Sequence, residues 1–418
     1  MNPSCEFIKI SRAASRMGQR HTDYKGEHLM INGERRISRP LRWGMVGGGR
    51  TSQVGYKHRT GALRDGTYCL VAGAFDLDAE QGRDFGVNLG VARERCYATY
   101  QDLITGETNR PDGVDVVSVA TPNSTHYAIT KALLTAGIHV ICEKPLFFTS
   151  AECDEIAVLA QQKGLIVGVT YGYTGHPLVY QMAAMVASGH LGEVRLVDMR
   201  YTHGFNAGDD INAPDAIKWR TNPKTAGATF VLGDIGTHVY YLSGIVLPHL
   251  KVEKLLCDRK AFIPSRAPLE DHAMVLLHYD NGARGHIWVS SVDAGNMRSQ
   301  HYRFIGSKAS LEWTDSNPDQ LIYEVQGEPR RILYHGMPYL AAESLAVDRM
   351  GALHSEGLGD SWANIYLWIA QAIDAKNRGD EAFLKTHHYP DLTAGTKGVR
   401  WLEACVRSAD HGAVWVDF

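Results

Sequence analysis

The sequence lacks the features that mark membrane-embedded and secreted proteins. It contains no apolar run of the roughly 18 residues that a transmembrane helix needs. Its first forty residues carry several arginines but no apolar segment of the kind found in a secretory signal. The seven cysteines include no Cys-x-x-Cys pair and show no zinc-ligand spacing with histidines. We therefore expect a cytoplasmic protein with free thiols and no metal site.

A strong excess of one charge is also missing. The net charge is −3, and no long block of like charge occurs. This argues against nucleic acid or an anionic membrane as the main partner. The 418 residues are 44% hydrophobic and 21% charged, which is ordinary for a globular protein with two or three domains.

Apolar runs that alternate with helical patterns dominate the chain from about residue 41 to residue 170. The runs lie at 41–47, 68–75, 97–105, 114–120, 138–143 and 165–170, the third being a short strand followed by a helix. Helical patterns lie at 50–63, 78–87, 124–136 and 151–163. This alternation predicts a parallel sheet covered on both faces by helices, which is the doubly wound α/β Rossmann architecture.

Beyond residue 170 the pattern changes to consecutive strands. Helices are predicted at 178–188, 227–247 and 360–375, and a polar, irregular segment at 209–225. Strands are predicted at 194–202, 251–263, 271–279, 283–292, 300–306, 309–314 and 320–326. Strands without intervening helices predict an antiparallel or mixed sheet. We expect an extension at 1–40, a nucleotide-binding domain at 41–170 and an α+β domain at 171–418, whose last helices can pack back on the first domain.

A glycine-rich turn after the first predicted strand is a candidate nucleotide site. Its candidate cofactor contacts are Gly47, Gly49, Arg50, Thr51 and Ser52. Gly47 permits the tight turn, and Gly49 lets main-chain amides approach a pyrophosphate at a helix N-terminus. Asp76 ends the second predicted strand, where a carboxylate accepts a hydrogen bond from a ribose 2′-hydroxyl and repels a 2′-phosphate. NAD is therefore favoured over NADP, although Asp76 could also be a simple helix cap.

Three further residues are candidates for the chemistry. Lys144, in Glu143-Lys144-Pro145, follows a strand at the sheet edge where doubly wound folds bind ligands. Asp234 and His238 are four residues apart and would share one face of a helix. Oxidation of a hydroxyl needs a base for its proton, so His238 could be that base, Asp234 could orient or relay, and Lys144 could stabilise the alkoxide. The alternative is a capping aspartate and a buried structural histidine.

Five segments together resemble the Gfo/Idh/MocA family of oxidoreductases. They are GMVGGGR at 44–50, TPNSTH at 121–126, ICEKP at 141–145, IKWRTNP at 217–223 and GATFVLGDIGTH at 227–238. The resemblance implies a Rossmann domain followed by an α+β domain whose large open sheet forms a homodimer or homotetramer interface. It also implies that Lys144, Asp234 and His238 are catalytic.

The resemblance assigns further residues to the cofactor and the substrate. Positions expected near the nicotinamide and its ribose are Thr121, Pro122, Asn123, His126, Glu143, Lys144, Trp219 and Arg220, the last two of which could equally anchor a surface loop. Tyr173 and His176 are candidate substrate contacts, with Asp234 and His238. Their alternative roles are a core tyrosine and a helix-capping histidine. Many relatives carry His-Asn before this tyrosine, whereas this chain has Tyr171-Gly172, so the substrate stays open.

The sequence therefore predicts an NAD-dependent dehydrogenase that oxidises a secondary hydroxyl of a sugar, glycoside or inositol. A redox-neutral NAD-dependent glycosidase of the same family is an alternative. A non-enzymatic sensor of NAD or sugars is a weaker one, because such proteins often lose the lysine or histidine that this chain retains as Lys144 and His238.

Overall fold

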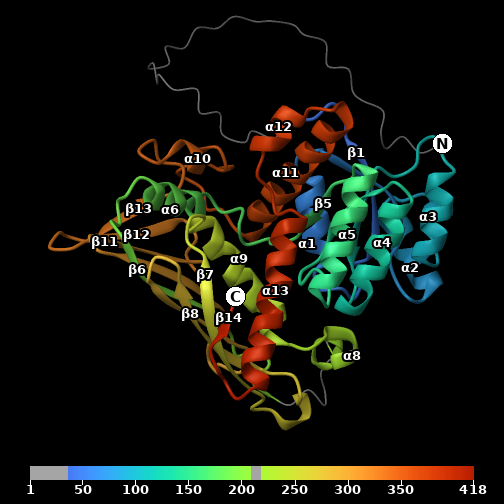
Figure 1. Cartoon of the computed structure of the whole chain (residues 1–418). Helices are drawn as coiled ribbons and strands as arrows, with labels where there is room; N and C mark the ends of the chain where they lie inside the picture. The colour runs from blue at the N-terminus through green and yellow to red at the C-terminus, as the bar shows by residue number, and fades with distance from the viewer. Residues whose placement is uncertain (1–35, 209–217) are drawn as a thin grey trace, which may run out of the picture.

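The computed structural model describes residues 36–208 and 218–418 (Figure 1). Nearly all of the predicted extension, and the first part of the predicted irregular segment at 209–225, lie outside the described residues. The described chain forms two sheets, each with its own covering helices, and the long helix α11 (Leu358–Arg378) lies beside the first sheet. None of the helices in the described ranges is long and apolar enough to cross a membrane.

The first sheet is parallel throughout and has the strand order β2-β1-β3-β4-β5. Its strands are β1 (Leu41–Gly47), β2 (Tyr68–Ala74), β3 (Val116–Ala120), β4 (His139–Cys142) and β5 (Val167–Val169). Every residue of β3 and β4 is buried, which explains why these strands are almost uninterrupted apolar runs. The predicted doubly wound architecture is confirmed.

Five helices connect these strands, and two of them correct the expectation from sequence. They are α1 (Gly55–Leu63), α2 (Ala79–Asn88), α3 (Tyr100–Thr108), α4 (His126–Thr135) and α5 (Ser150–Lys163). The predicted strand at the start of 97–105 is wrong, because none of its residues belongs to a strand; an isolated bridge between Gly73 and Cys96 precedes it, and α3 begins at Tyr100. The helix predicted from Arg50 begins only at Gly55, because residues 50–54 form turns instead, with the N–H of Ser52 bonded to the carbonyl oxygen of Gly49 at 3.0 Å.

The second sheet is mixed and has the order β13-β12-β11-β10-β6-β9-β8-β7-β14. β6 and β9 are parallel and the other neighbours are antiparallel. Its strands are β6 (Val194–Thr202), β7 (Val252–Lys260), β8 (His272–Tyr279), β9 (Arg284–Ser290), β10 (Ser299–Gly306), β11 (Ala309–Thr314), β12 (Gln320–Val325), β13 (Arg331–Tyr334) and β14 (Val416–Asp417). The sequence patterns predicted seven of these strands and missed β13 and β14.

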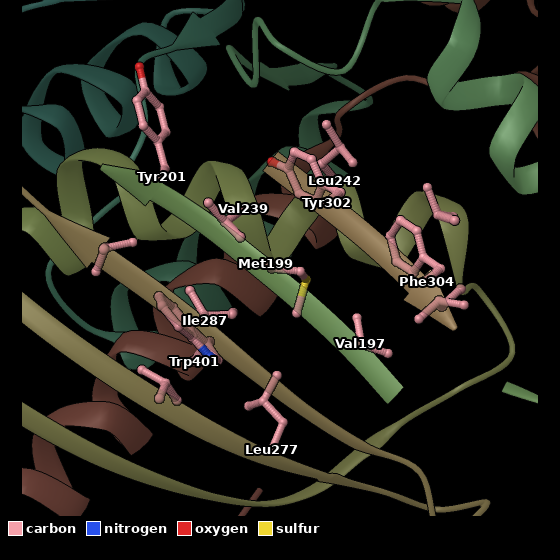
Figure 2. Close-up of a cluster of buried hydrophobic side chains, with 14 of the residues drawn as sticks. Val197, Met199, Tyr201, Val239, Leu242, Leu277, Ile287, Tyr302, Phe304 and Trp401 are labelled. Carbon is pink, nitrogen blue, oxygen red and sulfur yellow. The ribbon is translucent and has the colours of Figure 1, made fainter. Parts of the chain in front are cut away.

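Helices cover one face of this sheet, and a hydrophobic core lies between them and the sheet. The covering helices include α6 (Pro177–Ala187), α9 (Thr237–Val246) and α13 (Leu392–Asp410). Three shorter helices elsewhere in this part of the chain are α8 (Pro223–Ala226), α10 (Ala342–Leu345) and α12 (Glu381–Thr386). Figure 2 shows Met199 and Ile287 of the sheet among Val239, Leu242 and Trp401 of the helices, all of them buried. Burial alternates along β8 and β10, so the opposite face of the sheet is more exposed.

Two features of the helices position the candidate site. The predicted helix at 227–247 is divided into a π-helical turn, Leu232–Gly236, and the regular helix α9, and such turns are frequent at functional sites. α11 packs against α1, with Trp362 and Tyr366 buried beside His58. The start of α11 therefore lies beside α1, and Asp360 near that start pairs with Arg64 just beyond the end of α1.

Candidate active site

The glycine turn between β1 and α1 packs so closely against neighbouring main chain that side chains at its glycines would clash. A Cβ on Gly49 would lie 2.5 Å from the carbonyl oxygen of Phe75 and 3.2 Å from Oδ2 of Asp76. The structure thus brings the carboxylate of Asp76 next to the turn, although the two are far apart in sequence. Gly47 has a φ of +76°, which only glycine adopts readily. A cradle of bare main chain beside a strand-end carboxylate fits the pyrophosphate and ribose of a dinucleotide.

Gly55 has a role that the sequence patterns missed. A Cβ there would lie 2.2 Å from the carbonyl oxygen of Gly48, so close packing of helix on turn depends on Gly55 and not on Ser52. Oγ of Ser52 instead accepts the main-chain N–H of Gly55 at 3.1 Å and so fixes the start of α1. Arg50 and Thr51 are exposed at the outside of the turn. The signal for Gly55 was a glycine inside the predicted helix at 50–63, where glycine is unfavourable unless something packs closely against it.

The loops that follow β3 and β4 are joined by buried polar side chains. Nε2 of His126 lies 2.9 Å from the carbonyl oxygen of Thr121, and Nδ1 lies 3.0 Å from that of Pro145. The amide of Asn123 donates to the carbonyl oxygen of Ala226 at 3.1 Å. His126 and Asn123 therefore hold these loops in place through main-chain partners, and the contacts of His126 use both of its ring nitrogens. Pro122 lies in the same loop and is partly exposed.

Glu143 belongs to a buried hydrogen-bond network that was not predicted. Oγ1 of Thr170 donates to Oε1 of Glu143 at 2.5 Å, and Nε2 of His58 lies 3.2 Å from the same oxygen. Nδ1 of His58 lies 2.6 Å from the hydroxyl oxygen of Tyr366 on α11. Burial alone would raise the pKa of Glu143, but its contacts with His58, Lys144 and Thr170 lower it to about 2. The network ties the strand end that carries Lys144 to α1 and α11.

Lys144 and Asp234 join the loop after β4 to the π-helical turn that precedes α9. Nζ of Lys144 donates to the main-chain oxygen of Asp234 at 2.6 Å and to Oδ1 at 3.0 Å. Nε of Arg220 lies 3.5 Å from Oδ2, and its guanidinium stacks on the ring of Trp219. Burial would raise the pKa of Asp234, but Lys144 and Arg220 outweigh it and hold the pKa well below its usual range. Asp234 is therefore an ionised carboxylate between two cations.

His238 lies one turn beyond Asp234, and its buried ring packs against the rings of Tyr171 and Tyr173. Its Nδ1 is buried and has no hydrogen-bond partner among the described residues. The ring of Tyr173 meets it edge-on at 4.8 Å, and the hydroxyl of Tyr173 lies 2.7 Å from that of Tyr201. Burial and the nearby charge of Lys144 lower the pKa of His238 well below its ordinary value. The imidazole is consequently neutral at neutral pH and able to accept a proton.

A cavity of about 390 Å³ brings these groups together. It is lined by Lys144, Asp234 and His238, and also by Glu143, Tyr173, Tyr201, His203, Asn206, Arg220, Arg298, Leu358 and Trp362. Lys57 of α1 lines it as well and was not predicted; burial is the main cause of its lowered pKa. A larger hollow of about 1540 Å³, between α5, α9 and α13, contains none of the predicted catalytic residues.

The structure does not bring His176 to this cavity. His176 is buried at the N-terminus of α6, where its ring lies 5.4 Å from that of Trp313. Burial lowers its pKa to about 4. The prediction that His176 contacts substrate therefore lacks support from the geometry; His176 occupies the N-cap position of α6, as the capping alternative has it, but its side chain makes no capping hydrogen bond. Tyr173, three residues earlier, does line the cavity.

Comparison with known proteins agrees with this architecture. Residues 41–171 match the NAD-binding Rossmann fold of the Gfo/Idh/MocA oxidoreductases, and residues 183–418 match their C-terminal alpha/beta domain. The uncharacterized oxidoreductase YfiI of Bacillus subtilis is 61% identical over 394 residues, which cover 93% of this chain and all of that protein.

Solved structures extend the comparison. The inositol dehydrogenase homolog of Azotobacter vinelandii, complexed with NAD⁺, is 53% identical with a TM-score of 0.92, covering 93% of this chain and all of the other. The same homolog complexed with NADH and myo-inositol gives a TM-score of 0.89. Levoglucosan dehydrogenase, with 20% identity and a TM-score of 0.76 over 91% of this chain and 99% of the other, shares the fold. The chain therefore belongs to the Gfo/Idh/MocA family of oxidoreductases.

Proposed function

We propose that the protein is an NAD-dependent dehydrogenase that oxidises a secondary hydroxyl of a cyclic polyol or sugar. The observation that carries this proposal is the convergence of Lys144, Asp234 and His238 on one cavity at the carboxyl edge of the first sheet. The cavity volume of about 390 Å³ is within the range of small-ligand sites. A homolog that is 53% identical has been crystallised with NADH and myo-inositol, which favours inositol or a closely related ring.

The residues around the glycine turn fit the cofactor. Main-chain amides at Gly49 would hold the pyrophosphate, and Asp76 would accept hydrogen bonds from the ribose hydroxyls. The loops braced by His126 would support the nicotinamide end, close to Lys144. When bound, NAD supplies the acceptor for the hydride that leaves the carbon of the hydroxyl.

The protein side chains would accept the proton of the hydroxyl and stabilise the oxygen that loses it. His238 is neutral, so its imidazole can accept that proton as the hydride departs. The ammonium of Lys144 would stabilise negative charge that develops on the substrate oxygen. Asp234 would position Lys144 through the two hydrogen bonds described above and stays ionised because Lys144 and Arg220 flank it.

Polar groups spread around the cavity would recognise a ring with many hydroxyls. Tyr173, Tyr201 and Asn206 can each donate and accept hydrogen bonds, and Arg298 can donate. Such a surface suits a ligand whose polarity is distributed over several carbons.

The homodimer or homotetramer expected from the family resemblance, with subunits associated through the large second sheet, stays a prediction.

The test is an absorbance assay of the full chain with NAD and, separately, with NADP. The substrates would be myo-inositol and other inositols, free sugars, glycosides and anhydrosugars. We expect reduction of NAD with at least one cyclic polyol or sugar and at most weak reduction of NADP. Binding of NAD without its reduction by any of them would contradict the proposal. Release of an aglycone without net reduction would instead support the redox-neutral glycosidase.

A further inference from the structure

A buried polar cluster lies outside the candidate active site, in the connection between β13 and α11. His335 directly follows β13, Glu356 lies just before α11, and Asp348 lies between them in sequence. Their exposed fractions are 3%, 3% and 0% respectively. One potential metal-binding atom from each residue lies within 4.8 Å of those from the other two. The segment between β13 and α11 therefore folds back on itself and brings His335, Asp348 and Glu356 close together.

The hydrogen bonds of the cluster leave one carboxylate oxygen without a partner. Oε1 of Glu356 accepts two main-chain N–H groups, at 2.5 and 2.9 Å. Oε2 of Glu356 is buried and has no hydrogen-bond partner within the described residues. Oδ2 of Asp348 lies 2.7 Å from Nδ1 of His335. A buried carboxylate oxygen with no partner is unfavourable unless a cation or a donor occupies the space beside it.

The charges of the cluster also favour a cation. Asp319 adds a third carboxylate, with Oδ1 3.3 Å from Nε2 of His335. The nearby guanidinium of Arg349 is bound by both oxygens of Asp65, at 2.7 and 2.8 Å, so its charge is largely balanced there. Three carboxylates thus surround one imidazole. An imidazole with carboxylates is a ligand set that suits Zn²⁺ and Mn²⁺.

We propose that His335, Asp348 and Glu356 bind a divalent transition-metal ion of the Zn²⁺ type. Nδ1 of His335, Oδ2 of Asp348 and Oε2 of Glu356 would be the ligand atoms, and the proton shared between His335 and Asp348 would leave when the ion binds. Asp319 would not touch the ion. It would accept the Nε2–H of His335, and it already accepts the main-chain N–H of Glu356 at 3.0 Å. A carboxylate behind a metal-binding histidine commonly fixes the ring in this way.

The ion would be structural, because its ligands fasten both ends of the connection that leads into α11. The first residues of α11 include Leu358 and Trp362, which line the candidate active-site cavity. Arg349, next to Asp348, ties the same connection to Asp65 beyond α1. A bound ion would therefore stabilise the position of one cavity wall without taking part in the reaction. The sequence predicted no metal site because the three ligands are scattered over a long loop.

Metal binding can be measured on the full chain in the absence of NAD and polyol, so the result is independent of the proposed dehydrogenase activity. The protein would be treated with EDTA, dialysed and titrated calorimetrically with Zn²⁺, Mn²⁺ and Mg²⁺, and thermal unfolding would be followed with and without each ion. We expect one Zn²⁺ per chain, a rise in Tm of several degrees, and much weaker binding of Mg²⁺. No stoichiometric binding of Zn²⁺ or Mn²⁺ and an unchanged Tm would overturn the proposal.

Variants separate this cluster from the cysteine thiols, which could also bind Zn²⁺. Glu356→Gln should weaken Zn²⁺ binding at least tenfold, and Asp319→Asn by about 10- to 100-fold. Glu343→Gln, at an exposed glutamate of the same connection, is the matched control and should bind Zn²⁺ as the parent does. Asp319→Asn also serves if Glu356→Gln does not fold. Equal Zn²⁺ binding by the parent and the folded variants would overturn the proposal by placing the ion elsewhere.

Discussion

Replacement of Lys144 by methionine tests the proposed chemistry most sharply among single substitutions. Methionine keeps most of the aliphatic stem and removes the ammonium, which lies 2.6 Å and 3.0 Å from two oxygens of Asp234. Loss of one preorganised group that stabilises an oxyanion typically removes about 3 kcal/mol of transition-state stabilisation. At about 1.4 kcal/mol per factor of ten, we expect kcat to fall by about 10²- to 10³-fold.

The side chain of Lys144 is 10% exposed, and its partner Asp234 would retain Arg220, at 3.5 Å, as its ion-pair partner among the described residues. The pKa of Asp234 should therefore rise in Lys144→Met, whereas the glycine turn and Asp76 are untouched. The assay compares kcat with the polyol that reduces NAD in the parent, and the Kd of NAD from calorimetry. Lys224→Met, at an exposed lysine of α8, is the matched control. A kcat within threefold of the parent in Lys144→Met, with Asp234 still in place, would show that Lys144 does not stabilise the substrate oxygen during the reaction.

Three further substitutions test separate parts of the structure. His238→Ala should lower kcat by about 10²- to 10⁴-fold. In the parent, kcat/KM should not fall between about pH 8 and pH 6, because the lowered pKa of His238 keeps its base form populated; a fall with an inflection near pH 7 would contradict this. Gly49→Ala should raise the Kd of NAD at least tenfold in calorimetry, since its Cβ would lie 2.5 Å from a carbonyl oxygen, whereas Gly244→Ala meets no atom within 4 Å and should bind NAD normally. Tyr366→Phe removes a hydroxyl that contacts both His58 and Ser118, and it should lower the free energy of unfolding in urea by about 1–3 kcal/mol. Tyr56→Phe, at an exposed tyrosine, is the control and should leave that free energy unchanged. Equal free energies of unfolding for the two variants would count against the buried hydrogen-bond network.

The parts of the fold that could be predicted are those whose signal is local. The strands β1 to β5 are apolar runs of a sheet buried on both faces, and the glycine turn, Glu143-Lys144-Pro145 and Gly233–His238 are short motifs. The structure brings Lys144, Asp234 and His238 to one cavity, as the spacing of Asp234 and His238, the place of Lys144 at a strand end and the family resemblance together suggested. The roles of these residues in catalysis stay predictions until the variants are measured.

The features that could not be predicted depend on contacts between distant segments. His58 and Tyr366 are 308 residues apart, and nothing local indicates that they meet beneath Glu143. His176 follows a tyrosine that does line the cavity, but the start of α6 turns its ring toward Trp313 of the second sheet. Cys96, just before Tyr97, makes only an isolated bridge to Gly73, and the chain continues into α3 instead of forming a strand. Periodicity describes which residues are buried, but not against which partner.

The most direct test of the proposed dehydrogenase activity follows the hydrogen that is transferred from the polyol to NAD. The full chain would be incubated with NAD and a polyol deuterated at its carbinol carbons, with myo-inositol as the first choice, and the reduced cofactor would be analysed by mass spectrometry. We expect one deuterium in each molecule of reduced cofactor and slower turnover than with unlabelled polyol. Reduced cofactor without deuterium, or NAD that binds and is not reduced by any deuterated polyol or sugar, would contradict the proposed activity.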